Sequence, residues 1–255
     1  MKELVSIITP TYNSEKFISA TIQSVQSQTH SNWEMIIVDD CSSDKTIESI
    51  QNFMEDDHRI HLIQLSKNGG AGVARNTALN VAIGKHIAFL DADDLWKPKK
   101  LATQLAFMQN NNLPFTFSFY DCIDEGGNLL NKRVEAPKTV SYKQLFFCNY
   151  VGNLTGIYNS EYFGKIAISS SRKRQDWMVW LTLLKKIKTT QPVPESLAFY
   201  RVREDSISAS KGSLVTHNYS VYRQFHKLNV VVSLFCMIGF LFTQLVVKPL
   251  YVKKL

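Results

Sequence analysis

The sequence predicts an α/β fold with a mostly parallel central sheet flanked by helices. Three observations lead to this prediction. Apolar strands alternate with helical patterns over the first hundred residues, polar clusters follow those strands, and 255 residues with 45% hydrophobic content can bury a sizeable core. Alternation of this kind implies right-handed crossovers between parallel strands. We therefore expect the ligand site at the carboxyl ends of the strands, where helix N-termini also point.

The predicted elements follow one another in a regular order. Apolar runs predict strands over residues 4–9, 33–40, 59–65 and 86–90. Apolar residues at helical spacing predict helices that begin near Phe17 and that cover 44–54, 73–82 and, after Pro98, 99–108. Polar side chains suited to cap the first two helices are Asn13 or Ser14 and Ser42 or Ser43.

The pattern loosens from about residue 113. An aromatic run over 115–119 is followed by a turn at 125–128, which contains two glycines. A further helix is predicted to start near Asp176. Its inward-facing residues are expected to be Trp177, Trp180, Leu181 and Leu184.

The four cysteines lie far apart, with no C-x-x-C pair and no neighbouring histidine spacing that indicates a zinc site. The apolar run at the N-terminus is far shorter than that of a secretory signal and is better interpreted as a strand. Together these features favour a reduced, cytosolic compartment.

The last 50 residues differ in charge from the rest of the chain. The formal net charge is +7, yet all 22 acidic residues lie at or before Asp205, and six basic side chains with no acid follow it. Residues 229–247 carry no charge and are flanked by Arg223 and Lys227 on one side and by lysines on the other. A helix of this length spans roughly 28 Å, about the thickness of a bilayer's hydrocarbon core.

Two interpretations of this tail stay open. Its length and basic flanks fit attachment to a membrane with anionic lipids, as a single span or on the surface. A buried or amphipathic C-terminal helix would instead use Ser233, Thr243 and Gln244 as its polar positions. Nucleic-acid binding is not expected, because the tail has little interleaving of basic and aromatic residues.

Three carboxylates, Asp91, Asp93 and Asp94, directly follow the predicted strand at 86–90. Carboxylates this close repel one another and resist losing water unless a cation or hydrogen-bond donors compensate them. The D-x-D spacing at a strand end lets alternate carboxylates face one point, where Mg²⁺ or Mn²⁺ can take their oxygens together with substrate phosphates. A solvated acidic turn would show the same pattern.

Six segments, taken in order, resemble one known family. They read SIITPTYN (6–13), IIVDDCSSDKT (36–46), NGGAGVARN (68–76), FLDADD (89–94), RQDWMVWL (174–181) and YRVREDSIS (200–208). With these segments the chain resembles a family 2 glycosyltransferase of the inverting, bacterial cell-envelope polysaccharide type. The resemblance covers residues 4–210 and implies a Rossmann-like GT-A fold with a nucleotide-sugar donor, usually a UDP sugar.

The resemblance also implies roles for the donor-side residues. It makes Asp93 the ligand of a divalent metal, Mg²⁺ or Mn²⁺, with Asp91 as partner on the metal or the ribose. It stacks Tyr12 near the uracil and places the backbone of Pro10 and Thr11 around the base.

In the second of these segments, Asp40 is implied to accept a hydrogen bond from the uracil imide, with Asp39 behind it. An acceptor-only group distinguishes uracil from cytosine, whose ring nitrogen at that edge carries no proton. The glycines of NGGAGVARN let the backbone approach a ligand, and the resemblance places Arg75 on the diphosphate side of the donor. Arg201 and Arg203 are implied to lie near the diphosphate as well.

Asp176 is implied to be the general base of an inverting transfer. Such a base takes the proton of the acceptor hydroxyl while that oxygen attacks the anomeric carbon from the face opposite the diphosphate. The metal offsets the charge that develops on the leaving group. An Asp this early in a helix can also serve only as a cap or as a partner of the helix dipole.

The expected function is transfer of one sugar to a hydroxyl of a lipid-linked or cell-envelope glycan at the cytoplasmic face of the membrane. Residues 1–210 would form the GT-A domain, with a donor half at 1–112 and an acceptor half at 113–210, and 211–255 the membrane-associating tail. The Q-x-x-R-W element of processive synthases and further long apolar segments are absent from the sequence, so repeated extension is not expected.

Two other functions use the same features. A nucleotidyl or phosphoryl transferase on a similar sheet could use D-x-D with magnesium, and a non-catalytic module could keep the nucleotide-sugar pocket. The sequence leaves the sugar, the acceptor, the choice of metal and the oligomeric state open.

Overall fold

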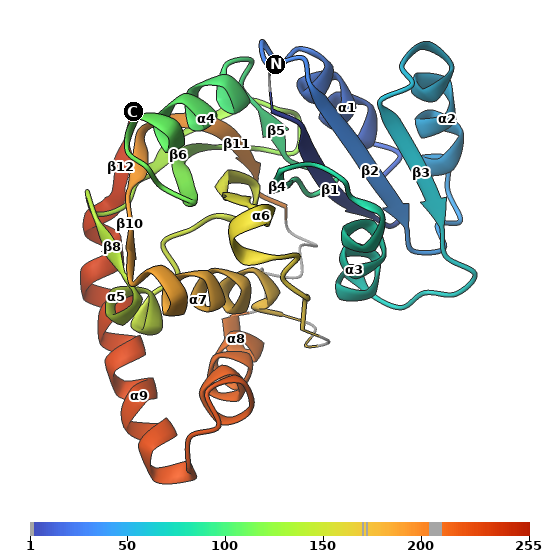
Figure 1. The fold of residues 1–255 in the computed structure, drawn as a ribbon. Coiled ribbons are helices and arrows are strands. Elements are labelled where there is room, and N and C mark those ends of the chain that lie inside the picture. The colour runs from blue at the N-terminus through green and yellow to red at the C-terminus, as the bar shows by residue number, and fades with distance from the viewer. Residues whose placement is uncertain (1–2, 170, 172, 204–210) are drawn as a thin grey trace.

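Four parallel strands form the N-terminal half of a curled sheet (Figure 1). They are β1 (Val5–Thr11), β2 (Trp33–Asp39), β3 (Ile60–Gln64) and β4 (His86–Phe89), in the order β3-β2-β1-β4. β1 is buried along its whole length, as expected for a parallel strand covered on both faces. Because β1 lies between β2 and β4, the winding direction reverses beside it, where α/β sheets commonly place a ligand. The computed structural model that shows this arrangement describes residues 3–169, 171, 173–203 and 211–255.

Helices alternate with these strands as the sequence predicts. They are α1 (Ile18–Gln26), α2 (Thr46–Asp56), α3 (Ala71–Val81) and α4 (Lys100–Asn110), the last of which follows the short strand β5 (Leu95–Trp96). The α/β fold class is therefore confirmed, and each predicted element lies within a few residues of its observed bounds.

The predicted helix caps are wrong. The amide groups of Phe17 and Ile18 donate to the backbone carbonyl of Ser14 at 2.9 and 3.0 Å, and no side chain caps α1. At α2 the first N–H, that of Thr46, donates to Asp44 Oδ1 at 3.0 Å, in place of Ser42 or Ser43. The expected capping residues instead join the two loops to one another, a long-range pairing that local sequence patterns do not indicate.

The second half of the sheet is mixed, unlike the first. Its strands are β6 (Phe115–Ile123), β7 (Leu129–Val134), β9 (Ile157–Asn159), β11 (Pro192–Arg201) and β12 (Val252–Lys254). β9 pairs antiparallel with both β4 and β6 and so joins the two halves, whereas β11 runs parallel to β6. β6 and β7 are connected by a turn of a few residues, which only antiparallel neighbours permit.

Shorter elements surround this second half. They are β8 (Val140–Ser141), α5 (Tyr142–Phe147), η1 (Asn153–Thr155), α6 (Ser160–Phe163) and β10 (Thr189–Thr190). The C-terminal elements are α8 (Lys211–Ser220), η2 (Val221–Phe225), α9 (Val230–Phe242), η3 (Thr243–Val247) and η4 (Lys248–Tyr251).

The helix α7 (Gln175–Ile187) is the centre of the main core. The four residues predicted to face inward, Trp177, Trp180, Leu181 and Leu184, are all fully buried. The Trp180 ring stacks on Phe115 with ring centroids 5.2 Å apart, and it leaves no room for a side chain at Gly156, where a Cβ would lie 2.4 Å from the ring. This packing fixes α7, and with it Asp176, against the sheet.

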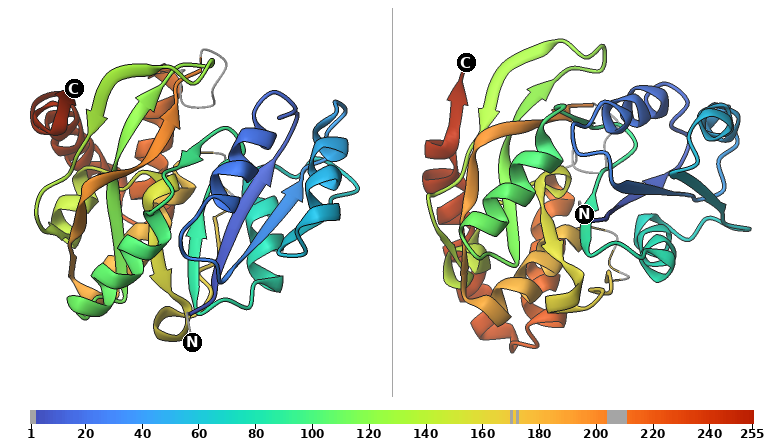
Figure 2. Two further views of the ribbon diagram at one scale, coloured as in Figure 1. Left: turned by 90° about the horizontal axis from the view of Figure 1, so that it is seen from above. Right: turned by 45° about the horizontal axis from the view of Figure 1, so that its top comes forward.

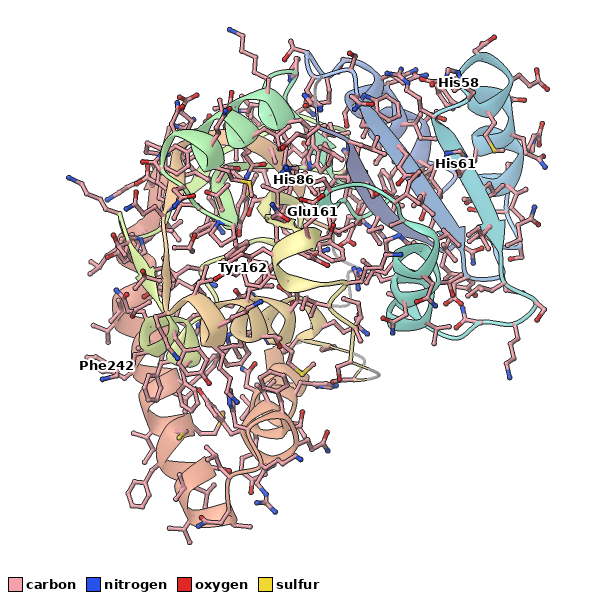
Figure 3. The ribbon with its side chains drawn as sticks, viewed as in Figure 1. His58, His61, His86, Glu161, Tyr162 and Phe242 are labelled. Carbon is pink, nitrogen blue, oxygen red and sulfur yellow. The ribbon has the colours of Figure 1, made fainter. Side chains whose placement is uncertain are left out.

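The C-terminal helix is docked along one face only. Residues Val230–Tyr251 form a continuous helical segment of 22 residues that is long and apolar enough to cross a membrane. Met237 and Phe240 are buried against the domain, whereas Phe235 is 69% and Leu245 75% exposed. α9 runs along the edge of the molecule in all views, on the side opposite α2 (Figures 1 and 2), and Figure 3 shows Phe242 on its outer side.

Candidate functional site

The loops that follow β1 and β2 are joined by reciprocal hydrogen bonds. The Asn13 amide N–H donates to Ser42 Oγ and the Ser43 amide N–H donates to Asn13 Oδ1, each at 2.9 Å. Asp39 Oδ2 accepts from the Ser42 amide at 2.8 Å, and the side chain of Asp39 is fully buried. Asp39 therefore stabilises this pair of loops from their buried side.

Tyr12 lies at the outer side of the same loops. Pro10 and Thr11 are buried at the end of β1, whereas Tyr12 is 52% exposed, so its ring is free to stack on a ligand. The buried hydroxyl of Thr11 has no hydrogen-bond partner among the residues that the structure describes. The predicted base-binding residues thus lie together at one rim of the sheet.

Asp40 holds the glycine-rich loop. Its Oδ1 accepts from the Gly69 amide and its Oδ2 from the Gly70 amide, both at 2.7 Å. Gly70 has a φ of +83°, which favours glycine at this turn into α3. Asp40 is 3% exposed, and each of its carboxylate oxygens keeps a second lone pair beside these amides.

Arg75 connects three parts of the chain. Its Nη2 pairs with Asp91 Oδ1 at 2.5 Å, and its Nη1 donates to Gln175 Oε1 at 2.6 Å. Asp91 Oδ1 also accepts from Asn153 Nδ2 at 3.1 Å. The buried Nε of Arg75 has no partner among the described residues, which makes it a candidate donor to a bound anion.

Asp93 is paired with Arg203. Arg203 Nη1 lies 2.8 Å from Asp93 Oδ2, with both side chains partly exposed. Burial, reinforced by repulsion from Asp91, raises the pKa of the Asp93 carboxyl, and Arg203 opposes this rise. Negative charge is therefore only partly compensated at this loop.

Arg201 takes a different position from the one expected of a phosphate ligand. It is 5% exposed, and its guanidinium donates to the backbone carbonyls of Asp93, Asp124 and Glu125 at 2.8–3.1 Å. Its own amide donates to Asp94 Oδ1 at 2.9 Å. Burial raises the pKa of Asp94 well above its ordinary value, with a further contribution from Asp93. Arg201 thus holds the acidic loop and the β6–β7 turn together, and residues 204–208 of the same predicted segment lie outside the described residues.

The acidic loop suits a divalent ion that also binds a ligand. The side-chain hydrogen bonds of Asp91 and Asp93 go to Oδ1 and Oδ2 respectively, which leaves one oxygen of each without a side-chain donor in the described part of the chain. The described residues contain no cluster of three or more His, Cys, Asp or Glu side chains that could hold a metal alone. Mg²⁺ and Mn²⁺ bind through one or two carboxylates plus substrate phosphates, so the two aspartates fit such an ion.

Asp176 lies in the first turn of α7, as predicted. Asn149 Nδ2 donates to Asp176 Oδ2 at 2.8 Å. The loop 149–153 thus carries one amide on Asp176 and another on Asp91, and Gln175, next to Asp176, holds Arg75. Two connections of a few residues therefore link the predicted base to the predicted metal site.

Sequence reasoning missed the amides of this site. Asn149, Asn153 and Gln175 orient charged residues that the sequence did identify. Gln175 stands beside Asp176 in the segment RQDWMVWL, which is the single signal that could have found it. Asn149 and Asn153 lie in a segment without a recognisable pattern.

Comparison with known proteins identifies relatives over nearly the whole chain. The family model of glycosyl transferase family 2 matches residues 6–162. TuaG of Bacillus subtilis, a glycosyltransferase assigned to teichuronic acid biosynthesis, is 41% identical over 94% of this chain and 95% of its own. The Escherichia coli UDP-Glc:alpha-D-GlcNAc-diphosphoundecaprenol beta-1,3-glucosyltransferase WfgD is 36% identical over 87% of this chain and 86% of its own.

Solved structures share the fold. TarS 1–349 of S. aureus in complex with UDP-GlcNAc superposes with a TM-score of 0.71 and 21% identity, over 94% of this chain and 72% of that one. The mannosyltransferase PcManGT of Pyrobaculum calidifontis, in complex with GDP-Man and Mn²⁺, gives 0.67 and 16% over 98% and 72%. These similarities confirm the GT-A fold expected from the sequence.

The contact between α3 and Gln175 leads to a prediction for stability. A Cβ at Gly72 would lie 2.5 Å from Gln175 Nε2, so Gly72→Ala displaces the amide that holds Arg75. The gain of about 1 kcal/mol that Ala normally brings to a helix should be reversed, to a net loss of about 1–2 kcal/mol. Urea unfolding of Gly72→Ala, Gln175→Ala and the double variant measures this. In the Gln175→Ala background the loss at Gly72 should shrink, and strictly additive losses would contradict the prediction.

Proposed function

Because the chain belongs to glycosyl transferase family 2, we propose that it is an inverting enzyme that transfers one sugar from a UDP sugar to a glycan hydroxyl. Its family makes it a glycosyltransferase. The observation that carries the finer proposal is the position of Asp176, which Asn149 contacts directly and which lies beside the Gln175–Arg75–Asp91 connection. A base and a diphosphate site so joined suit a direct displacement.

The donor is proposed to bind across the carboxyl ends of β1, β2 and β4. Tyr12 would stack on the base, with Pro10 and Thr11 beside it and Asp40 at the imide edge. Arg75 and Arg203 would bind the diphosphate, because both are cationic and border the acidic loop. Arg201, which donates to three backbone carbonyls, would hold the loop without contacting phosphate, and Asp39 would support the base-binding loops.

Asp91 and Asp93 would hold the divalent ion, which when bound offsets negative charge on the leaving diphosphate. Asp176 would take the proton of the acceptor hydroxyl as its oxygen forms a bond to the anomeric carbon. The bond from that carbon to the diphosphate breaks, and the nucleoside diphosphate leaves with the electron pair. Attack from the opposite face inverts the anomeric configuration.

The acceptor is proposed to be a lipid-linked or cell-envelope glycan at the cytoplasmic face of the membrane. The name of the relative WfgD describes a lipid-linked acceptor, and that of TuaG an envelope polymer. The outward face of α9 is apolar, and β12 places Lys253 and Lys254 opposite Arg133 and Lys132. An apolar face beside basic residues suits a surface with anionic lipids.

Attachment on the surface fits the structure better than a span. Thr243, Gln244 and Lys248 all donate hydrogen bonds to residues 147–149 of the domain. A helix that crossed the bilayer would have to give up these contacts and carry the same polar groups into lipid. We therefore propose that the helix lies along the membrane with its docked face on the enzyme.

Asp176→Asn should lower turnover by about 10²- to 10⁴-fold, because the amide cannot accept the proton of the acceptor. UDP release from UDP-Glc and UDP-GlcNAc measures turnover, and calorimetry measures UDP affinity, which should stay within about twofold. Asp56→Asn, an exposed acid at the end of α2, is the matched control. Binding without turnover in the unaltered protein would instead indicate a non-catalytic module.

Asp93→Ala should abolish the effect of Mn²⁺ on UDP binding. The loss of one of two carboxylate ligands should lower Mn²⁺-dependent affinity for UDP at least about tenfold, while affinity without metal changes little. Calorimetry with Mn²⁺ and with EDTA measures both, and Asp56→Ala serves as control. An unchanged Mn²⁺ effect would remove the metal from the proposal.

Replacing Phe235, Ile238 and Phe242 together by serine should weaken membrane binding at least about tenfold, because these exposed side chains supply apolar area to the lipid. Co-sedimentation with vesicles of phosphatidylglycerol and phosphatidylcholine measures binding.

The matched control removes three exposed apolar residues elsewhere, Val81, Ile83 and Leu129. This control should bind vesicles like the unaltered protein. Equal losses in both triple variants would show that α9 is not the membrane contact.

A further inference from the structure

The orientation of the Asn149 amide is fixed. Its Oδ1 accepts from the Val151 amide N–H at 3.2 Å, so the Nδ2 end faces Asp176 and donates to Oδ2 at 2.8 Å. A donor at this position restricts the rotation of the Asp176 carboxylate. A general base has to be held within hydrogen-bond reach of the proton that it accepts.

The backbone around Asn149 is held by the C-terminal helical segment. Thr243 Oγ1 donates to the Phe147 carbonyl at 2.6 Å, and Lys248 Nζ donates to the Asn149 carbonyl at 3.1 Å. Between them, Gln244 Nε2 lies 3.3 Å from Cys148 Sγ. Three consecutive residues, 147–149, are thus each bonded to one face of the same helix.

Close packing also holds the helical segment Val230–Tyr251 in place. A Cβ at Gly239 would lie 2.9 Å from the Phe147 ring, so only glycine permits this approach of α9. The Phe240 ring lies 5.6 Å from Trp177, the residue after Asp176. At the far end, β12 adds a strand to β7. The helix is therefore fixed at both ends of the contact with residues 147–149.

A second contact reaches the other side of Asp176. Arg174, which precedes α7 in the left-handed conformation with a φ of +65°, donates from Nε to Asn218 Oδ1 of α8 at 2.6 Å. A non-glycine residue in this conformation is held by its surroundings at some energetic cost. Thus α8 holds Arg174 on one side of the proposed base, and the helical segment Val230–Tyr251 holds residues 147–149 on the other.

We propose that Asn149 is a positioning residue for Asp176 and that the C-terminal helix, through its bonds to residues 147–149, holds Asn149 in place. This inference rests on the proposed role of Asp176 as the base. The C-terminal helix would then have two roles. Its outer face contacts lipid, and its inner face holds Asn149, which positions the base.

Three charged or titratable groups of the described residues also interact electrostatically with Asp176. They are Arg174 before α7, Lys248 from the C-terminal segment and Tyr120 from β6. Burial lowers the pKa of the Lys248 ammonium, and Asp176 opposes this fall. Variants that keep these three groups are needed to isolate Asn149, so the tests below change neutral residues.

Asn149→Ala should lower kcat for UDP release about tenfold and leave KM for the UDP sugar within about twofold. A loss of kcat with KM preserved is expected of a misplaced base, whereas a general structural defect would change KM as well. Asn111→Ala, an exposed amide at the end of α4, is the control and should change neither.

Thr243→Val tests the helix itself, because it removes one hydroxyl without changing shape or charge. It should lower kcat several-fold and leave KM within about twofold, as Asn149→Ala does, and the two effects should not add in the double variant. Thr182→Val is the matched control, since among the described residues the Thr182 hydroxyl bonds only the Met178 carbonyl of its own helix.

The reactivity of Cys148, which is fully buried and contacts Gln244, tests the helix contact without an activity assay. Gln244→Leu and Thr243→Val should speed the labelling of Cys148 by a thiol reagent, measured by peptide mass, at least about threefold relative to Thr182→Val. Circular dichroism and UDP affinity confirm that each variant is folded.

The outcomes separate the two proposals. If Asp176→Asn abolishes turnover but Asn149→Ala and Thr243→Val leave kcat unchanged or change KM as much as kcat, the positioning role is wrong and the base stands. If Asp176→Asn retains turnover, the base assignment is wrong and this inference goes with it. A lowered kcat with preserved KM in both variants, with the controls unchanged, supports the positioning role.

Discussion

Repulsion among Asp91, Asp93 and Asp94 is the constraint that the rest of the site depends on. Three carboxylates in four residues at the end of β4 need compensation, and the chain brings it from distant elements. Arg75 comes from α3, and Arg203 follows β11. The backbone amide of Arg201 adds a donor to Asp94. Because these partners come from both halves of the sheet, neutralising the acids also closes one half against the other.

Arg75 and Arg203 compensate part of the charge of the acidic loop. The loop could therefore accept a metal ion although it does not form a complete metal site by itself. Arg203 compensates Asp93 from one side, and one oxygen of Asp93 and one of Asp91 have no side-chain donor among the described residues. An incoming ion would meet two carboxylates and the phosphates that it carries with it. A nucleotide sugar and a cation would therefore bind as a unit more readily than either alone.

Local patterns predicted the parts of the fold that local chemistry decides. The four parallel strands, the helices between them and the buried face of α7 follow from apolar periodicity, and the acids at the end of β4 follow from their spacing. The caps of α1 and α2 and the mixed second half of the sheet depend on which distant segment supplies a partner. The same limit applies to the site: charged residues were identified, but whether Arg201 faces a ligand or a carbonyl, and which amides orient Asp91 and Asp176, is set by tertiary contacts.

The one-sided docking of the C-terminal helix matters for anyone who wishes to purify this enzyme. A tail with an exposed apolar face invites removal, so that the protein can be produced without detergent. Cutting the chain before residue 229 would also remove the strand β12 and the three bonds to residues 147–149. Polar replacements confined to the outward side chains, such as Phe235 and Leu245, would improve solubility while sparing that inner face.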